Sequence, residues 1–200
     1  MSSLLAKEHL SDAYPALAPT FDALGSVELP HNKTILVAEA ITRIVIGQML
    51  SRQAAQSIYG RVEQKKKERG LEGSWHLDID DLVVQGVSTR KARTIKEFGE
   101  RYDRNPEIYE AWRCLKHEEI REKVSENWGL STWSADILSI FYFGLPDVFP
   151  LEDGTIKRVV QYINKELFEN QPFDPNRARP YRTYISLYLW KIVDEKFFDI

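Results

Sequence analysis

The stretch Glu119–Phe143, EIREKVSENWGLSTWSADILSIFYF, contains two helical patterns joined by a short turn. The first pattern is amphipathic, the turn reads apolar-Gly-apolar around Gly129, and the second pattern has Trp133 and Ala135 in its first turn. A glycine turn lets the backbone approach a phosphate closely, and the free amides at the start of the second helix suit an anion. The stretch therefore predicts a helix-hairpin-helix motif over about residues 117–143.

The composition predicts a globular protein of modest size. The chain has 200 residues, of which 43% are hydrophobic, enough for one sizeable core or two small lobes. No window approaches the roughly 18 apolar residues that a membrane span needs, and residues 1–14 lack a signal-peptide pattern. We therefore expect an intracellular protein without a membrane partner.

Cysteine and histidine usage argues against a metal centre. Cys114 is the only cysteine, which excludes an internal disulfide and a four-cysteine zinc or iron–sulfur site. The four histidines have no ligand spacing, so we expect no metal. The net charge of −3 and a pI near 5.9 disfavour nucleic-acid binding by bulk electrostatics. They remain compatible with a few local cations and backbone amides.

Helical periodicity extends over most of the chain, and strand alternation is absent, so the expected fold class is all-α. We expect one compact unit over residues 1–200, a helical bundle with two lobes. The expected helices cover residues 35–62 (one helix or two), a short segment before Gly86, 89–102, a segment starting near Pro106, 117–127, 132–143, 155–168 and 177–195.

An acidic segment follows the hairpin. The sequence FPLEDGTIK, residues 149–157, places Glu152 and Asp153 between an apolar run and the next helix start near Thr155. Asp is a preferred N-cap residue, so capping alone explains Asp153. A carboxylate at this point can also face a substrate, because a helix N-terminus favours negative charge.

Several segments in fixed order carry a family resemblance. They are IGQMLSRQAA (46–55), the hairpin, DVFPLEDGTIKRVV (147–160) and RPYRTYISLYLW (179–190). Together they resemble the helix-hairpin-helix (HhH-GPD) DNA glycosylase superfamily, and most of all its alkylbase branch, the 3-methyladenine DNA glycosylase II group. The resemblance extends from about residue 35 to 191. The family's hairpin commonly reads Gly-apolar-Gly-x-Trp-Thr-Ala, and residues 129–135 here read Gly-Leu-Ser-Thr-Trp-Ser-Ala.

The resemblance implies a role for each matching position. It implies that Asp153 is the catalytic carboxylate and that Met49, next to Gln48, is the wedge that enters the duplex. The base pocket would be formed by Trp133, Tyr181 and Ile137, the last of which stands where some members have a tyrosine. Contacts to the DNA backbone are expected from the hairpin and the following helix, at Gly129, Ser131, Thr132, Lys157 and Arg158.

The implied chemistry is hydrolysis of an N-glycosidic bond. Bond cleavage develops positive charge on the deoxyribose, which a carboxylate can stabilise while it orients a water molecule. Bifunctional members carry a lysine nucleophile at the position of Trp133, and no lysine lies between Val124 and Thr155. The sequence thus predicts a monofunctional enzyme of base excision repair that acts on an alkylated purine such as 3-methyladenine. Its expected partner is double-stranded DNA with a damaged base, and we expect a monomer without a cofactor.

Other interpretations stay open. The enzyme could act on deaminated or other damaged bases, or the chain could be a catalytically silent helix-hairpin-helix DNA-binding protein. Met49 also suits a packed core, and a core position is expected for the aromatic side chains of Phe141, Tyr142, Phe143, Tyr188 and Trp190. Ser131 replaces the second glycine of the family's hairpin, so it must adopt a positive φ or the turn must differ. A cation bound by the carbonyls of residues 128–131 would suit the hairpin, but the sequence does not show one.

Overall fold

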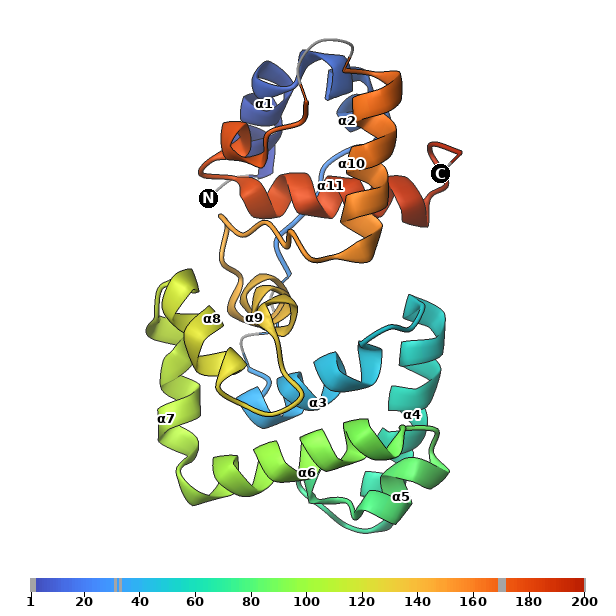
Figure 1. Ribbon diagram of the computed structural model, residues 1–200, viewed down its shortest axis with the longest axis vertical. Helices are drawn as coiled ribbons and strands as arrows, with labels where there is room; N and C mark the ends of the chain where they lie inside the picture. Colours follow the sequence, from blue (N-terminus) through green and yellow to red (C-terminus); the bar gives the residue numbers. More distant parts are fainter. Residues whose placement is uncertain (1–2, 31, 33, 169–171, 200) are drawn as a thin grey trace. The chain divides into compact units, whose positions relative to one another are not determined.

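The computed structural model describes residues 3–30, 32, 34–168 and 172–199 (Figure 1). These residues form helices and connecting loops without a β-strand, which confirms the predicted all-α class. By their contacts the residues divide into two units, one formed by residues 32–138 and the other by residues 1–31 and 139–200. No helix of the described ranges has the length and apolar character to cross a bilayer.

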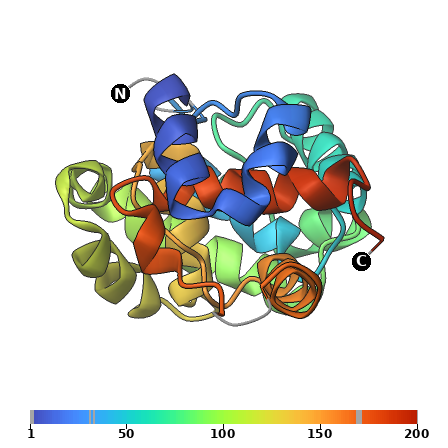
Figure 2. The same cartoon turned by 90° about the horizontal axis from the view of Figure 1, so that it is seen from above.

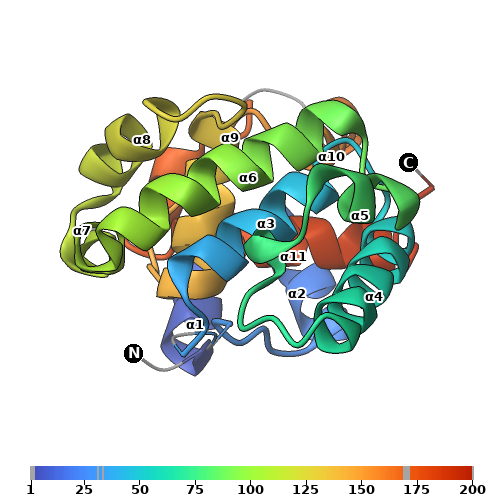
Figure 3. The same ribbon diagram turned by 90° about the horizontal axis from the view of Figure 1, so that it is seen from below.

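The 32–138 unit is built around a central helix, α3. Its elements are α3 (Val37–Gly47), α4 (Arg52–Glu68), α5 (Ile79–Val84), α6 (Thr89–Arg104), α7 (Pro106–Glu110), α8 (His117–Ser125) and α9 (Thr132–Leu138), with 3₁₀ turns at Ser74–His76 and Ala111–Cys114. Helix α3 packs against α4, α6 and α9, and Figure 3 shows it alongside α6. Nine of its eleven residues are buried, as expected for a helix that is apolar on most sides.

The second unit combines both ends of the chain. Its elements are α1 (Ser3–Ala13), α2 (Ala18–Leu24), a π-helical turn (Ser139–Phe143), α10 (Gly154–Glu166) and α11 (Arg182–Asp194), with 3₁₀ turns at Pro15–Leu17 and Pro175–Ala178. Figure 2 shows α1 and α2 (blue) lying across α11 (red), and α10 also packs against α11.

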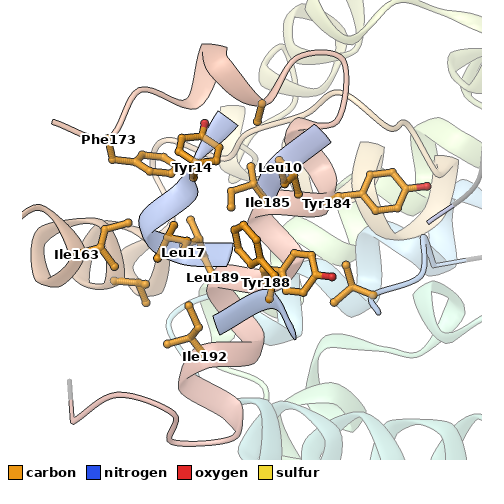
Figure 4. Packing of buried hydrophobic residues seen from close by; sticks show 14 of the residues in the cluster. Leu10, Tyr14, Leu17, Ile163, Phe173, Tyr184, Ile185, Tyr188, Leu189 and Ile192 are labelled. Atoms are coloured by element: carbon orange, nitrogen blue, oxygen red, sulfur yellow. The ribbon is translucent and has the colours of Figure 1, made fainter. Parts of the chain in front are cut away.

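Buried side chains from α1, α2, α10, α11 and their connecting segments form the core of this second unit (Figure 4). Aromatic rings occupy much of it: Tyr14 stacks on Phe173 with ring centres 5.0 Å apart, and Phe21 lies 4.7 Å from Tyr188. Each such ring removes a large apolar area from water, so this core fixes the position of α10 and α11, the helices next to Asp153.

The structure agrees with most of the predicted helices and differs at three places. Residues 35–62 form two successive helices, and the hairpin helices start where expected. The helix predicted over 132–143 is α-helical only to Leu138 and continues as a π-helical turn. The helix predicted over 177–195 starts at Arg182, because Pro180 interrupts the helical hydrogen bonds. Helices α1 and α2 were not predicted.

Candidate active site and nucleic-acid interface

Asp153 is the N-cap residue of α10. Its Oδ1 accepts hydrogen bonds from the backbone N–H groups of Thr155 and Ile156, each at 3.0 Å. The indole Nε1 of Trp190 in α11 donates to the same oxygen at 3.0 Å. The residue is 9% exposed. Three N–H donors on one oxygen fix the orientation of the carboxyl group and suit an ionised carboxylate. The capping interpretation is therefore correct, and it is compatible with the catalytic one.

The loop before Asp153 is held by the first turn of α11. Arg182 donates from Nε to Asp147 Oδ1 at 2.7 Å and from Nη2 to Asp147 Oδ2 at 3.0 Å. The hydroxyl of Thr183 donates to the carbonyl of Leu145 at 2.6 Å and accepts from the N–H of Val148 at 3.0 Å. These contacts limit the movement of residues 145–150, so α11 supports Asp153 both directly and through this loop.

Trp190 contributes to the site although no sequence pattern predicts it there. It lies 37 positions after Asp153, and only the packing of α10 against α11 brings the indole to the carboxylate. Tyr181, predicted for the base pocket, precedes α11 and is partly buried at the edge of the core. Its ring lies 5.2 Å from His9 and 5.9 Å from Tyr184. These contacts are those of a packed aromatic, and its role in base binding stays a prediction.

The two helices of the hairpin are joined by a buried ionic cluster. Asp136 in α9 is fully buried and accepts two hydrogen bonds from Arg121 in α8, both at 2.7 Å. His117 Nε2 lies 2.7 Å from the same carboxylate. A bidentate arginine–carboxylate pair fixes both distance and orientation, so this cluster holds α8 and α9 in register. No sequence pattern predicts this role for Asp136.

The hairpin turn places its left-handed residue at Gly129, with φ of 79°. A Cβ at this position would lie 2.2 Å from Oγ1 of Thr94 in α6, so only glycine fits. Ser131 does not share the positive φ. Its carbonyl accepts the first helical hydrogen bond, from Ala135, and its N–H donates to Oγ of Ser134 at 3.4 Å. The turn therefore differs from the two-glycine pattern, and Ser131 acts as a helix start.

The predicted wedge residue Met49 lies in a tight turn between α3 and α4. Its side chain is fully exposed and its backbone has φ of 57°, an uncommon value for a residue with a side chain. The preceding residue, Gln48, is partly buried and donates from Nε2 to the carbonyl of Gly129 at 3.2 Å and to Ser134 Oγ at 3.3 Å. The structure thus joins the predicted wedge turn to the predicted hairpin, 81 positions away in the chain. The interpretation of Met49 as core filler is wrong.

Trp133 and Ile137 are both partly buried and lie four positions apart on α9 and the same face of that helix. Ser131 and Thr132 are exposed at its N-terminus, where the amides of a helix are available to an anion. Trp128, in the turn, is 43% exposed, and the guanidinium of Arg90 lies 5.8 Å from its ring centre. This arrangement is compatible with the predicted phosphate contact, which stays a prediction.

Lys157 and Arg158 are exposed on α10. Lys157 forms an ion pair with Glu152 at 2.8 Å, and both side chains are more than half exposed. Such surface pairs contribute little to stability, so Lys157 can exchange Glu152 for a phosphate at small cost. The pair also gives Glu152 a contact that the sequence did not predict.

The predicted residues divide between the two units. Asp153, Lys157, Arg158 and Tyr181 belong to the unit formed by both chain ends, and the wedge and hairpin residues belong to the 32–138 unit. Within the 32–138 unit the structure joins the predicted Gln48 to the predicted Gly129, and in the other unit Asp153 is bound by Trp190, which was not predicted.

Comparison with known proteins gives relatives of one kind. No protein-family model matches the chain. The chain is 27% identical over 167 residues to DNA-3-methyladenine glycosylase 1 of Schizosaccharomyces pombe, covering 76% of this chain and 71% of that protein. It is 25% identical over 200 residues to the alkylbase DNA glycosidase-like protein mag2 of the same yeast, covering 94% and 92% of the two chains.

A solved structure has the same fold. The 3-methyladenine DNA glycosylase Mag1 of S. pombe, in complex with abasic DNA, superimposes with a TM-score of 0.71 at 22% identity, covering 94% of this chain and 96% of that one. The relatives and this shared fold confirm the resemblance that the hairpin and the Asp153 segment predicted, and this chain is thereby recognised as similar, in sequence and in fold, to the HhH-GPD alkylbase DNA glycosylases.

Proposed function

We propose that this protein is a monofunctional DNA glycosylase of base excision repair that hydrolyses the N-glycosidic bond of an alkylated purine. The single observation that carries the proposal is the fixed carboxylate of Asp153, bound by three N–H donors at the start of α10. The relatives add support, because two of them are named as a DNA-3-methyladenine glycosylase and an alkylbase glycosidase-like protein.

The proposed chemistry needs one carboxylate and one water molecule. Alkylation at a ring nitrogen gives the purine a positive charge, so the base leaves with the electron pair of the glycosidic bond and becomes neutral. Asp153 stabilises the positive charge that develops on the deoxyribose and orients the water whose oxygen bonds to the sugar carbon. The water loses one proton to solvent, and the products are the free base and an abasic site.

The remaining roles are assigned by position. Trp133 offers an aromatic face to a cationic base, an interaction of about 0.5 to 2 kcal/mol, and Tyr181 and Ile137 add to the pocket. Met49 fills the gap that an everted base leaves in the duplex. Gly129, Ser131, Thr132, Lys157 and Arg158 contact phosphates. Damaged double-stranded DNA as the substrate, a monomeric state and an intracellular location are parts of the same proposal.

A base-release assay tests the proposal. Methylated duplex DNA is incubated with the protein, and free 3-methyladenine and 7-methylguanine are measured by chromatography. The expected result is release of base with strand breaks only after alkali treatment, because the chain between Val124 and Thr155 has no lysine for a Schiff base.

Two outcomes would contradict this proposal. Duplex binding at low salt without release of any base would identify a catalytically silent DNA-binding protein. Release from DNA with deaminated bases but not from methylated DNA would place the substrate in the other class of damage.

A further inference from the structure

The turn between α3 and α4 holds Met49 in a conformation that needs support. Gln48 has φ of −51° and ψ of 130°, Met49 has φ of 57°, and the N–H of Leu50 donates to the carbonyl of Gly47 at 3.2 Å. These values define a type II β-turn, in which the third residue is normally glycine or asparagine. A methionine at this position costs conformational energy, so contacts elsewhere must stabilise the turn.

The side chain of Met49 does not supply that support, since it is fully exposed. Contacts of the neighbouring backbone do. The ammonium group of Lys91 donates to the carbonyl of Ile46 at 2.9 Å and to the carbonyl of Gln48 at 2.6 Å. These carbonyls lie at the C-terminal end of α3, where the helix dipole favours a positive charge. One side chain therefore holds the backbone on both sides of Gly47 and directly before Met49.

Lys91 is placed for this contact by the start of α6. Its own N–H donates to the side-chain oxygen of Ser88, the N-cap residue, at 3.4 Å. The lysine side chain is partly buried, and this burial lowers the pKa of its ammonium group. Burial of an ammonium group is unfavourable unless hydrogen bonds compensate, which agrees with its two short bonds to carbonyl oxygens.

The same helix also supports the hairpin. Thr94, three positions after Lys91, fills the space beside Gly129, where no Cβ fits. Gln48 completes the arrangement by donating to the carbonyl of Gly129. The first turns of α6 thus contact the wedge turn through Lys91 and the hairpin through Thr94. The relative position of wedge and hairpin follows from these two contacts and the Gln48 bond.

We propose that Lys91 is a positioning residue for base eversion, which holds the turn at residues 47–50 so that Met49 projects at a fixed place relative to the hairpin. This role rests on the proposed function, because Met49 acts as a wedge only in a protein that everts a base. Lys91 does not contact the reacting atoms in this proposal. It acts through the turn, so its loss affects eversion and leaves the chemistry at Asp153 intact.

A labelling experiment tests the positioning role without any activity measurement. Met1 and Met49 are the two methionines of the sequence, so selective ¹⁵N-methionine labelling gives at most two amide signals, of which Met49 reports on the turn. Lys91→Leu is expected to lower the ¹H–¹⁵N NOE of this amide, and Lys91→Arg, which keeps hydrogen-bond donors, to preserve it. The matched control is Lys96→Leu, on the same helix, which is expected to leave the signal unchanged. An unchanged NOE in Lys91→Leu would overturn the proposal.

A kinetic comparison then links the turn to eversion. Single-turnover base release is measured from two methylated duplexes. One is fully paired, and in the other the lesion lies opposite an abasic site, so that less unpairing is needed to evert the base. Lys91→Leu is expected to slow base release about tenfold from the paired duplex and less than about threefold from the duplex with the opposite abasic site. Equal slowing on both substrates would contradict a role in eversion.

The two experiments separate failure of this role from failure of the proposed function. If the wild-type protein releases no base, the proposed function fails, and the NOE still decides whether Lys91 holds the turn. If Lys91→Leu unfolds, Lys91→Arg is the test instead. The arginine variant keeps hydrogen-bond donors, so it is expected to preserve the NOE of Met49 and the rate of release from the paired duplex. If Lys91→Arg folds but loses both as fully as expected for Lys91→Leu, hydrogen bonding by residue 91 is not what orders the turn.

Discussion

At the scale of single residues, the candidate site depends on how one carboxyl group is held. Asp153 Oδ1 accepts from two backbone N–H groups of α10 and from the indole of Trp190. The two backbone donors are part of the helix cap, and the substitution of a side chain does not remove them. The indole bond is a separate support, which a single substitution removes.

Trp190→Phe tests this support. The substitution keeps an aromatic ring in place and removes the Nε1–H donor, so we expect a loss of about 1 kcal/mol in unfolding free energy. Single-turnover base release should slow about tenfold, because the carboxylate loses one of the groups that orient it. Phe141→Leu, which alters the ring that packs 5.4 Å from Trp190, is the control for packing alone. A rate for Trp190→Phe equal to wild type would mean that the backbone donors are sufficient.

At the scale of elements, the hairpin is stabilised by the ion pair between α8 and α9. The carboxylate of Asp136 is fully buried, and Arg121 and His117 both contact it. Removal of one member of a buried pair leaves the others without compensation, which is more costly than loss of an exposed pair.

Asp136→Asn is therefore expected to destabilise the protein by about 3 kcal/mol, because the neutral amide of the same shape cannot neutralise the positive charge of Arg121. Urea denaturation monitored by circular dichroism gives the value. Glu126→Gln is the matched control, since Glu126 pairs with Lys123 on the exposed side of the hairpin and should contribute less than about 0.5 kcal/mol. Equal effects of the two substitutions would show that the buried cluster does not hold the hairpin.

The sequence predicted those elements whose signals are local. Capping and turn residues within a few positions predict the helix starts at Thr89 and Pro106 and the hairpin around Gly129. Helix α1 has a weaker signal, because only Ala6 and Leu10 of its eleven residues are buried. The contacts Trp190–Asp153 and Lys91–Gln48 join positions 37 and 43 apart, so they depend on tertiary packing that no local pattern reveals.

At the scale of the whole molecule, buried tyrosines occur in both units. Burial raises the pKa of Tyr188 to about 12, with a further contribution from Asp22. Burial also raises the pKa of Tyr14, Tyr59 and Tyr102. In each case the folded protein disfavours the phenolate, whereas the unfolded chain ionises near the ordinary value of about 10.

These shifts predict a loss of stability at alkaline pH. Because the pKa of these tyrosines is raised in the folded state, their contribution to the free energy of unfolding is complete below about pH 10. It declines as the pH rises toward about 12, since only the unfolded chain ionises in this range. The urea concentration at the midpoint of denaturation should therefore decrease as the pH is raised from about 9.5 to about 11. Tyr188→Phe removes one of these phenol groups, so the urea midpoint of this variant should depend less steeply on pH. A midpoint independent of pH in this range would contradict the expectation.

The most direct test of the catalytic role is the single-turnover rate of base release by Asp153→Asn. Asparagine is as good an N-cap as aspartate and keeps an oxygen for the three donors, so the variant isolates the negative charge. We expect an unchanged affinity for DNA with an abasic analogue and a rate at least about 100-fold below wild type. A rate equal to that of the wild-type protein would contradict the assignment of Asp153 as the catalytic carboxylate.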